Sequence, residues 1–372
     1  MMSPVTVAAF IDSVKDPEKR LRALSSDGTK ILGYFCTYTP TEIIHAAGFL
    51  PIRIMGGTGQ VKEAYSLTPN FICPYMRLTM EKALRGEYDF LSGLIQGYTC
   101  DVACGLVNIW KENIGSQLYH AMPLPYNDNP ESRKFFRSAI MELVDKLAAL
   151  GGKFSEAALD QSLDLFSSIR NLVINLYEMR YDRRLPLSAV DLLYTVQAGF
   201  VTPPEEYLKM LEALTQGLEG AEIQETGGVP VLVSGSLIEE PRILEMLEQA
   251  GLQLVADDLC TGIRHFHPPS GQGKDPIERL IDRYQHHLPC PARVRAKDRV
   301  SPIMEMIERS GARGIVFLFQ KFCTPHLADY PILSEVLKKE GIPNILIEME
   351  ETGVMEGQLR TRLEAFVEML KD

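Results

Sequence analysis

Cysteines are the residues of this chain whose type and placement could do chemistry. Six of the seven stand where an apolar run ends and a loop or a helix begins. These six are Cys36, Cys73, Cys100, Cys260, Cys290 and Cys323. Because they are spread along nearly the whole chain, they can meet only if folding brings the ends of several strands together. Thiolates select iron–sulfur clusters and zinc, so a thiolate-lined pocket at the carboxyl ends of parallel strands would suit an iron–sulfur cluster.

Each cysteine taken singly could also be a small buried apolar residue, because free cysteine is among the most buried residue types. Three share one context, an apolar strand followed by Cys and then by Thr or Asp, and these are Cys36, Cys100 and Cys323. Cys73 is a fourth candidate ligand. Cys104, four residues past Cys100, is expected to fill the core. The chain has no CxxC pair, which disfavours both a zinc site and thioredoxin-like chemistry.

The length and composition exclude several classes of protein. With 372 residues the chain is long for one hydrophobic core and is predicted to form two domains of ordinary size. The net charge of −11 argues against a nucleic-acid partner, since binding phosphate backbones requires a basic face. No apolar run reaches the roughly 18 residues of a membrane helix, and residues 1–20 lack the pattern of a signal peptide. We therefore expect a cytoplasmic protein without a membrane partner, where cysteines serve metals or catalysis more often than disulfides.

The densest basic segment runs from Arg293 to Arg299. Its simplest interpretation is a solvated helix start. The alternative is a binding site for a small anionic group such as a nucleotide phosphate.

The first third of the chain alternates strands with helices. Residues 6–26 have the periodicity of an amphipathic helix, a short helix capped by Thr41 covers residues 42–47, and another covers residues 101–110. Short apolar runs followed by turn residues predict four strands, over residues 31–35, 50–54, 90–95 and 118–122. Strands that alternate with helices imply a parallel sheet.

The remaining two thirds form a helical segment and a second α/β unit. From residue 132 to about 220 the apolar residues recur at helical spacings and predict no strand. The second unit has four predicted strands and two helices, over residues 230–234, 252–256, 314–319 and 344–348 and over 241–250 and 358–370. We predict an α/β protein of three parts. Residues 1–130 hold an N-terminal helix and the first lobe, residues 131–225 form an all-helical connector, and residues 226–372 form the second lobe.

The segments around the cysteines carry a resemblance to a known family. They read GYFCTYTPTEIIHAAGFLPIRI around Cys36, CPYMR from Cys73, GYTCD around Cys100, DDLCTGIRHF around Cys260 and KFCTPHLADYPIL around Cys323. The tail continues with GIPNILIE and GQLRTRLEAFVEML. In these segments the chain resembles the superfamily of 2-hydroxyacyl-CoA dehydratases and benzoyl-CoA reductases, in its iron–sulfur component D or its related B- and C-type reductase subunits.

The resemblance implies a fold and a metal site. The fold would be two flavodoxin-like, or Rossmann-like, parallel-sheet lobes joined by helices, with a low-potential cluster between them. Members of the family hold a [4Fe–4S] cluster by three cysteines, and the matching positions here are Cys36, Cys100 and Cys323, with Cys73 close behind. A subgroup binds a double-cubane [8Fe–9S] cluster through six cysteines, and Cys260 and Cys290 match its two additional positions. Otherwise these two would merely line the pocket.

The resemblance also implies an activity. One electron delivered to the carbonyl of a CoA thioester would give a ketyl radical anion, which expels an α-hydroxyl group or passes electron density to an aromatic ring. The chain would thus be the iron–sulfur subunit of an acyl-CoA dehydratase or reductase, with the benzoyl-CoA reductase type slightly preferred. Two alternatives stay open: a double-cubane reductase of small molecules, and a non-catalytic subunit that relays electrons or serves as a scaffold.

Such an electron requires an energy source and partners. The chain has no GxxxxGK[ST] loop that would bind ATP. The family uses a separate ATP-dependent activase with its own cluster. We therefore expect this chain to accept electrons from an activase, to bind acyl-CoA as substrate, and to pair either with a paralogous subunit as a heterodimer or with a second copy as a homodimer.

Five polar residues are further candidates for the site. Glu42 could donate a proton, although an acidic residue in the first turn is also explained by the helix dipole. Tyr38 and Tyr98 could donate hydrogen bonds near the cluster. Arg264 and Lys321 could meet CoA phosphates or the negative charge of the cluster.

The histidines give weaker signals. His265, His267 and His326 flank the pocket cysteines, and one of them could act as a general acid. His45 is expected to be a satisfied core or surface residue. The pair 286–287 is interpreted as an exposed helix end.

Overall fold

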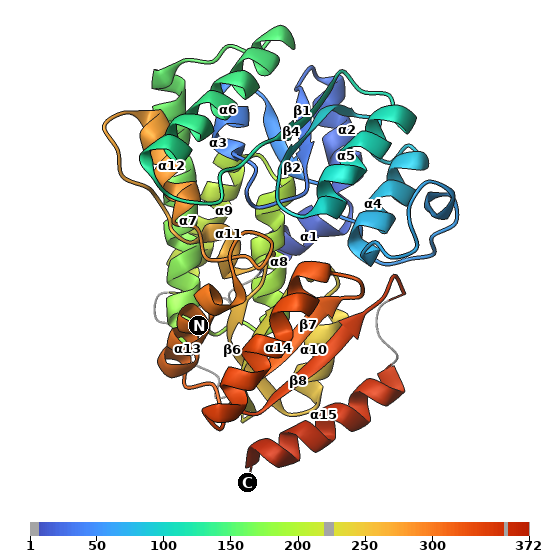
Figure 1. The fold of residues 1–372 in the computed structure, drawn as a ribbon, viewed down its shortest axis with the longest axis vertical. Coiled ribbons are helices and arrows are strands. Elements are labelled where there is room, and N and C mark those ends of the chain that lie inside the picture. Colours follow the sequence, from blue (N-terminus) through green and yellow to red (C-terminus); the bar gives the residue numbers. More distant parts are fainter. Residues whose placement is uncertain (1–6, 219–226, 353–355, 372) are drawn as a thin grey trace.

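The first half of the protein contains a four-stranded parallel sheet (Figure 1). The computed structural model describes residues 7–218, 227–352 and 356–371. The strands of the first sheet are β1 (Ile31–Tyr34), β2 (Leu50–Arg53), β3 (Leu91–Gly97) and β4 (Leu118–Met122). They lie in the order β2-β1-β3-β4, and every pairing is parallel. All four strands were predicted, with ends shifted by at most two residues.

The second half repeats this arrangement. Its strands are β5 (Val229–Gly235), β6 (Leu252–Asp258), β7 (Gly314–Gln320) and β8 (Asn344–Met349). Their order, β6-β5-β7-β8, is the same relative order as in the first sheet, and again every pairing is parallel. β7 is buried along its whole length, as expected of an internal strand with a continuous apolar run. The order second-first-third-fourth is how a flavodoxin-like sheet begins, so the predicted α/β fold class is confirmed.

Helices cover both faces of the first sheet. They are α2 (Pro17–Ser26), α3 (Thr41–Ala46), α4 (Pro74–Leu84), α5 (Asp101–Asn113) and α6 (Pro130–Ala149), with a short 3-10 helix at Ala64–Ser66. α1 (Ala8–Lys15) instead packs into a core with the connecting helices. Residues of α2, α4 and α5 share one hydrophobic core, and those of α3 and α6 share another on the opposite face. The single helix predicted over residues 6–26 is wrong, because Pro17 begins a new helix; residue 6 lies outside the described residues. α4 was not predicted.

Long helices connect the two sheets. They are α7 (Glu156–Tyr181), α8 (Ala189–Val201) and α9 (Pro204–Leu218). Figure 1 shows α7 running alongside both lobes. In the described part of residues 132–218 there is no strand, so the predicted helical character of this segment is confirmed.

Not all helices of the second half pack against the second sheet. They are α10 (Arg242–Gln249), α11 (Ile263–Phe266), α12 (Pro276–Gln285), α13 (Ala296–Ser310), α14 (Thr324–Lys339) and α15 (Glu356–Lys371). α12 packs into the core formed by α3 and α6 of the first half, through Ile277, Leu280, Ile281 and Tyr284. The chain thus returns to the first lobe after β6. The predicted limits of the three parts stay a prediction, and the one at residues 225–226 lies outside the described residues.

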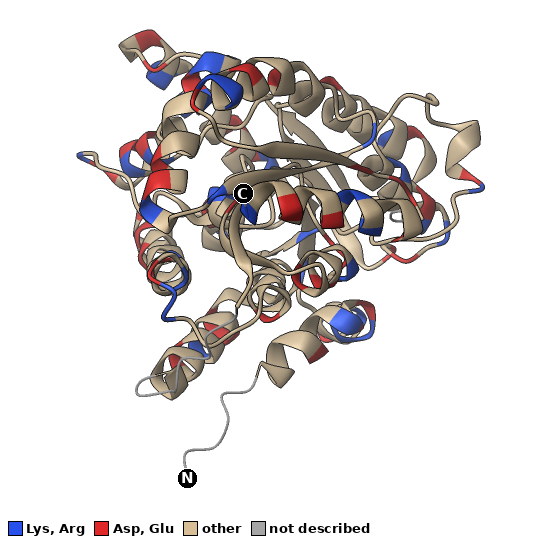
Figure 2. Ribbon diagram, turned by 90° about the horizontal axis from the view of Figure 1, so that it is seen from below, with Lys and Arg blue, Asp and Glu red and all other residues tan. Residues whose placement is uncertain are grey.

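Charged residues of both signs are mixed over the helices in the view of Figure 2. Many form pairs within one helix, such as Arg22 with Glu18 and Lys339 with Glu335. Exposed pairs of this kind contribute little to stability. Among the described helices, none is long and apolar enough to cross a membrane.

Candidate functional site

Six of the seven cysteines lie between the carboxyl ends of the two sheets. Four follow strands within three residues: Cys36 follows β1, Cys100 follows β3, Cys260 follows β6, and Cys323 follows β7. The two sheet ends are in contact, because the guanidinium of Arg53, the last residue of β2, reaches Cys260. Four of the six cysteines thus follow carboxyl ends of strands, two in each sheet.

Three of these cysteines, which we name the helix-start group, are the residues just before helices. Cys73 precedes α4, Cys100 precedes α5 and Cys323 precedes α14. The sulfur of Cys100 accepts a hydrogen bond from the backbone N–H of Ala103 at 3.4 Å. The sulfurs of Cys73 and Cys323 have no such capping hydrogen bond among the described residues. The positive end of a helix favours a thiolate at this position.

The other three, which we name the loop group, are Cys36, Cys260 and Cys290, and they lie outside helices and strands. The hydroxyl of Thr99 donates to the sulfur of Cys36 at 3.4 Å. Arg53 holds Cys260 by two contacts, from Nη2 to the sulfur and from Nη1 to the carbonyl oxygen, each 2.9 Å long. The loop group therefore contains a direct arginine–sulfur contact between the lobes.

The cysteines affect one another's pKa. Burial raises the pKa of Cys36 to about 12, and Cys260 and Cys290 add to this shift. Burial also raises the pKa of Cys323 well above its ordinary value, followed by the effects of Cys73 and Cys100. Thiols this close and this buried are protonated in the metal-free protein, and a metal has to displace those protons.

Cys104 differs from the six. Its pKa is raised to about 11 by burial, and the only charged neighbour that contributes is Asp101. It is 5% exposed. This placement agrees with the core role expected for it.

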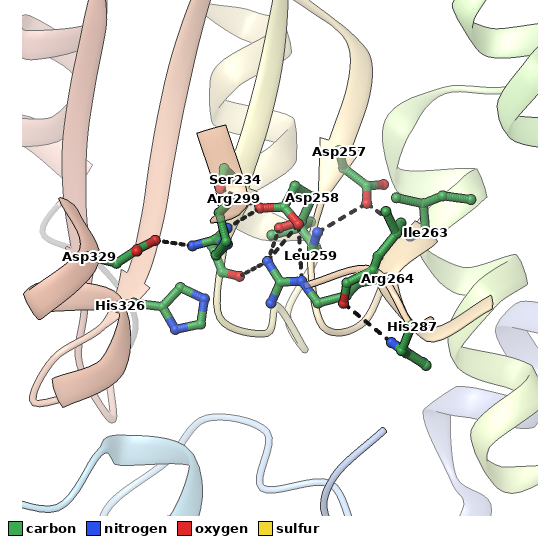
Figure 3. A network of polar contacts seen from close by, with 12 residues as sticks. Ser234, Asp257, Asp258, Leu259, Ile263, Arg264, His287, Arg299, His326 and Asp329 are labelled. Atoms are coloured by element: carbon green, nitrogen blue, oxygen red, sulfur yellow. Dashed lines mark hydrogen bonds and ion pairs between the residues drawn. The ribbon is translucent and has the colours of Figure 1, made fainter. Parts of the chain in front are cut away.

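A buried ion-pair network lies at the carboxyl end of β6 in the second lobe (Figure 3). Asp258 binds two arginines, Arg264 from α11 and Arg299 from α13, and it also accepts a hydrogen bond from Ser234 at 2.8 Å. Arg299 bridges to a second carboxylate, Asp329 of α14. Burial opposes ionisation of Asp258, yet the two arginines lower its pKa below the ordinary value. Asp258, Arg264 and Arg299 are therefore charged.

A second buried network involves Glu42, which is 0% exposed. Its carboxylate pairs with Arg170 of α7, lies 4.0 Å from Arg283 and accepts a hydrogen bond from the hydroxyl of Tyr284 at 2.9 Å. Burial raises its pKa, but Arg170 and Arg283 outweigh this and the pKa is lowered overall. A carboxylate held ionised in this way is suited to joining α3, α7 and α12 rather than to donating a proton.

Buried cations outnumber buried carboxylates around the cysteines. The arginines of this region that are less than a tenth exposed are Arg53, Arg170, Arg264, Arg283, Arg293 and Arg299. The comparably buried carboxylates are Glu42, Asp258 and Asp329. Glu239 beside Arg53 is a further carboxylate, whose pKa burial raises to about 7, and the six arginines still outnumber these four carboxylates. Buried charges require compensation, so this region suits an anionic group.

Several of the same arginines also have buried nitrogens without a hydrogen-bond partner among the described residues. They are Nε of Arg53, Nη1 of Arg264, Nη1 of Arg283 and Nε of Arg293. Orphaned buried donors are rare in proteins. Together with the six thiols, these donors fit an iron–sulfur cluster held by thiolates, which carries negative charge and accepts hydrogen bonds at sulfur.

The described residues contain no group of three His, Cys, Asp or Glu side chains close enough to hold one metal ion.

The predicted polar residues differ in how far they are exposed to solvent. Tyr38 is buried, with its ring 4.8 Å from the ring of His287 and with Arg293 above it. Tyr98 is 49% exposed. Lys321 is exposed and pairs with Glu350 at 2.6 Å, so its ammonium does not enter the buried site.

The histidines require one correction. His287 is buried and reaches the hydroxyl of Thr37, so only His286 is at an exposed helix end. His265 also contacts the Thr37 hydroxyl, at 2.8 Å, and Nδ1 of His326 lies 3.3 Å from the sulfur of Cys323. Burial and nearby arginines lower the pKa of all three buried imidazoles well below the ordinary value, so they are neutral.

The last two histidine predictions concern His45 and His267, and only the one for His45 is confirmed. His45 is satisfied by Ser162 and Glu205, as expected. The pKa of His267, which follows α11, is lowered mainly by burial.

Sequence reasoning missed most of the arginines. Arg53 lies in a strand and Arg170 in a helix of the connector, and neither has a local signal. The basic segment from Arg293 to Arg299 does begin a helix, α13, but both terminal residues of the segment are buried. The prediction of a solvated segment is therefore wrong for these two and holds for Arg295, whose side chain is 74% exposed.

The chain is similar to a known family and to several known proteins. The sequence profile of the family described as 2-hydroxyglutaryl-CoA dehydratase, D-component, matches residues 36–370. The chain is 26% identical to the (R)-phenyllactyl-CoA dehydratase beta subunit of Clostridium sporogenes, over 97% of each chain. It is 28% identical to the beta subunit of lactoyl-CoA dehydratase of Anaerotignum propionicum, over 98% of this chain and 99% of the relative. It is 27% identical to a benzoyl-CoA reductase subunit of Thauera aromatica, over 92% and 91%.

Solved structures add nothing to this comparison. The complex of SsGBP with GDP matches with a TM-score of 0.24 and 11% identity, over 92% of this chain and 99% of that chain. A likeness of this size carries no argument.

Proposed function

Because the chain belongs to the superfamily of 2-hydroxyacyl-CoA dehydratases and benzoyl-CoA reductases, we propose that it is the enzyme subunit that carries a low-potential iron–sulfur cluster and delivers single electrons to a CoA thioester. The observation that carries this proposal is the convergence of thiols from both lobes at the facing sheet ends. Relatives that match over their whole length are named as subunits of acyl-CoA enzymes, which supports a partner subunit for this chain.

The donor set supports the proposed cofactor. When bound, an iron–sulfur cluster supplies one electron at a time and an iron that can act as a Lewis acid toward a carbonyl oxygen. The protein supplies thiolate ligands, backbone N–H groups and a surplus of buried cations. Cys36, Cys100 and Cys323 are the proposed ligands of a [4Fe–4S] cluster, with Cys73 as the next candidate.

The chain's own residues also offer a path for protons. The Thr37 hydroxyl lies next to Cys36 in sequence and contacts two neutral imidazoles, Nδ1 of His265 at 2.8 Å and Nε2 of His287 at 3.4 Å. A neutral imidazole has one donor and one acceptor nitrogen and can pass a proton along. We assign the proton supply to this trio instead of to Glu42.

A double-cubane cluster is the second candidate, and one observation favours it. Apart from burial, Cys260 and Cys290 raise the pKa of the Cys36 thiol more than any other residue does. This supports assigning them to the same buried site. In that case the six cysteines of the two groups would be ligands, and the protein would reduce small molecules without CoA.

Iron analysis of protein purified or reconstituted without air separates these candidates. About four irons and four sulfides per chain are expected for a [4Fe–4S] cluster, and about eight irons for the double-cubane cluster. Electron paramagnetic resonance of the reduced protein would identify the paramagnetic state. Colourless, iron-free protein after reconstitution would overturn both candidates.

An activity assay tests the choice between a catalytic subunit and an electron relay. The chain would be combined with its partner subunit and an ATP-dependent activase, and benzoyl-CoA and 2-hydroxyacyl-CoA thioesters would be compared. We expect turnover of one thioester class, with the benzoyl type slightly preferred. An iron-loaded chain that accepts electrons and turns over neither class would be a relay.

A further inference from the structure

Arg53 is a buried cation that donates hydrogen bonds to the sulfur and the carbonyl oxygen of Cys260. It is 1% exposed, and no ion pair joins it to a carboxylate among the described residues. Its guanidinium also lies 5.0 Å from the ring centre of Phe200, and its Nε has no hydrogen-bond partner in the described part. A buried arginine that binds no carboxylate but touches a thiol is placed to compensate negative charge at sulfur.

Arg264 approaches the same cysteines from the second lobe. It is 0% exposed. Its Nε and Nη2 bind Asp258, whereas Nη1 is buried without a hydrogen-bond partner in the described part of the chain. Figure 3 shows this amino group without a dashed contact. The charge of Arg264 acts on Cys290 and Cys260.

Arg264 and Arg299 together balance Asp258 and Asp329, because Arg299 pairs with both carboxylates. Asp258 also accepts a hydrogen bond from Ser234. Arg264 still has one buried amino group that no group of the described residues uses. This free donor is what Arg264 can offer to a group bound beside Cys260 and Cys290.

We propose that Arg53 and Arg264 are positioning residues that act through the loop-group sulfurs and raise the reduction potential of the bound cluster. The inference rests on the proposed function. Reduction adds negative charge to the cluster, and fixed cations with N–H donors near its sulfurs stabilise the reduced form more than the oxidised form. Arg53 acts directly on Cys260, and Arg264 acts through its free amino group and its charge.

The test is a redox titration of anaerobically prepared, iron-loaded protein, followed by electron paramagnetic resonance. Arg53→Met and Arg264→Met each remove a charge and keep apolar volume. Arg180→Met is the matched control, because Arg180 is also buried and binds backbone carbonyls of Leu254 and Leu187 rather than cysteines. At the wild-type midpoint potential, the ratio of reduced to oxidised cluster should fall about tenfold in each test variant, a shift of about 59 mV for one electron, and should stay unchanged in the control.

Charge-retaining variants keep the proposal falsifiable if iron loading suffers. Arg53→Lys and Arg264→Lys should restore iron content and most of the potential. An unchanged potential in both iron-loaded Met variants would overturn the inference and leave the proposed function standing. Iron loss that lysine does not rescue, with a lowered unfolding temperature, would mark a purely structural role and would also overturn it. Wild-type protein without iron would instead mean that the proposed function fails.

Discussion

The helix-start group and the loop group surround one site but differ in what lies beside their sulfurs. Cys73, Cys100 and Cys323 are the residues just before helices, and the sulfur of Cys100 accepts a hydrogen bond from a backbone N–H of the first turn of α5. The loop group has no helix behind it. Its surroundings include the full charges of Arg53 and Arg264, which come from different lobes.

The difference shows two ways of stabilising negative charge at sulfur. A helix start carries its partial positive charge in the backbone, so any sequence that forms the helix provides it. A buried arginine is a full charge that depends on one side chain, and it costs free energy unless an anion accompanies it. The helix-start group should therefore tolerate substitutions around it, whereas the loop group should be sensitive to single distant residues.

Removing cysteines from each group gives the largest expected effect. Cys323→Ala should abolish iron loading with either type of cluster. Cys260→Ala should leave about four irons if a single cluster is held by the helix-start group and Cys36, and should remove iron substantially if the cluster is a double cubane. Iron and sulfide analysis after anaerobic reconstitution measures both. Cys104→Ala is the control, and loss of iron there would show that the ligand assignment is wrong.

Breaking the ion-pair network at the carboxyl end of β6 should destabilise the fold. Arg299→Met removes the cation that bridges Asp258 and Asp329. A buried carboxylate left without a partner costs about 3–5 kcal/mol, measurable as a lower midpoint in urea. Arg309→Met removes an exposed pair with Glu178 and should change stability by less than about 1 kcal/mol. Equal effects of the two substitutions would contradict the buried-charge argument.

The pH dependence of stability should reveal Glu239, which joins the lobes beside Arg53. Its carboxylate accepts hydrogen bonds from the backbone N–H groups of Gly56 at 2.6 Å and Gly57 at 3.0 Å. Burial raises its pKa from 4.5 to about 7. The folded protein therefore binds this proton more tightly than the unfolded chain does, and the stability from this group falls as the pH rises from about 4.5 to about 7.

Glu239→Gln removes this titration. The difference in unfolding free energy between wild type and variant should shift by about 1–2 kcal/mol in favour of the variant between about pH 5 and pH 8, after allowing for solvent screening. Denaturant titrations at the two pH values measure it. A constant difference would mean that Glu239 does not titrate in this range.

The smallest effect is expected from the backbone next to the helix-start group. Phe322 has a φ of 62°, a conformation that costs a bulky residue about 1–3 kcal/mol. Its side chain is 37% exposed, so the packing lost on substitution offsets part of the relieved strain. Phe322→Gly should raise stability by about 1 kcal/mol, seen as a higher unfolding temperature. Arg183→Gly, at a φ of 56°, is a comparison outside the site.

Local patterns in the sequence were sufficient to predict the strands but missed several helices, such as α4. Alternation of apolar runs with helical periods predicted all eight strands, because a strand or helix depends on neighbouring residues. Parallel order then places the strand ends at one edge of each sheet, so Cys36, Cys100 and Cys323 could be expected to approach one another. Which cysteines bind iron stays a prediction.

Only the tertiary structure decided the charges around these cysteines. Arg53 and Cys260 are 207 residues apart in the sequence, and nothing near either residue indicates their contact. The folding of α12 onto the first lobe buries His287 and orients Tyr284 toward Glu42, so these residues could not be placed from local patterns. Charge interactions depend on distance in space and on burial, and neither is encoded in the residues next to a side chain. The sequence alone thus determined the two parallel sheets and their cysteine-bearing ends, whereas the packing of the lobes determined the electrostatic environment in which those thiols lie.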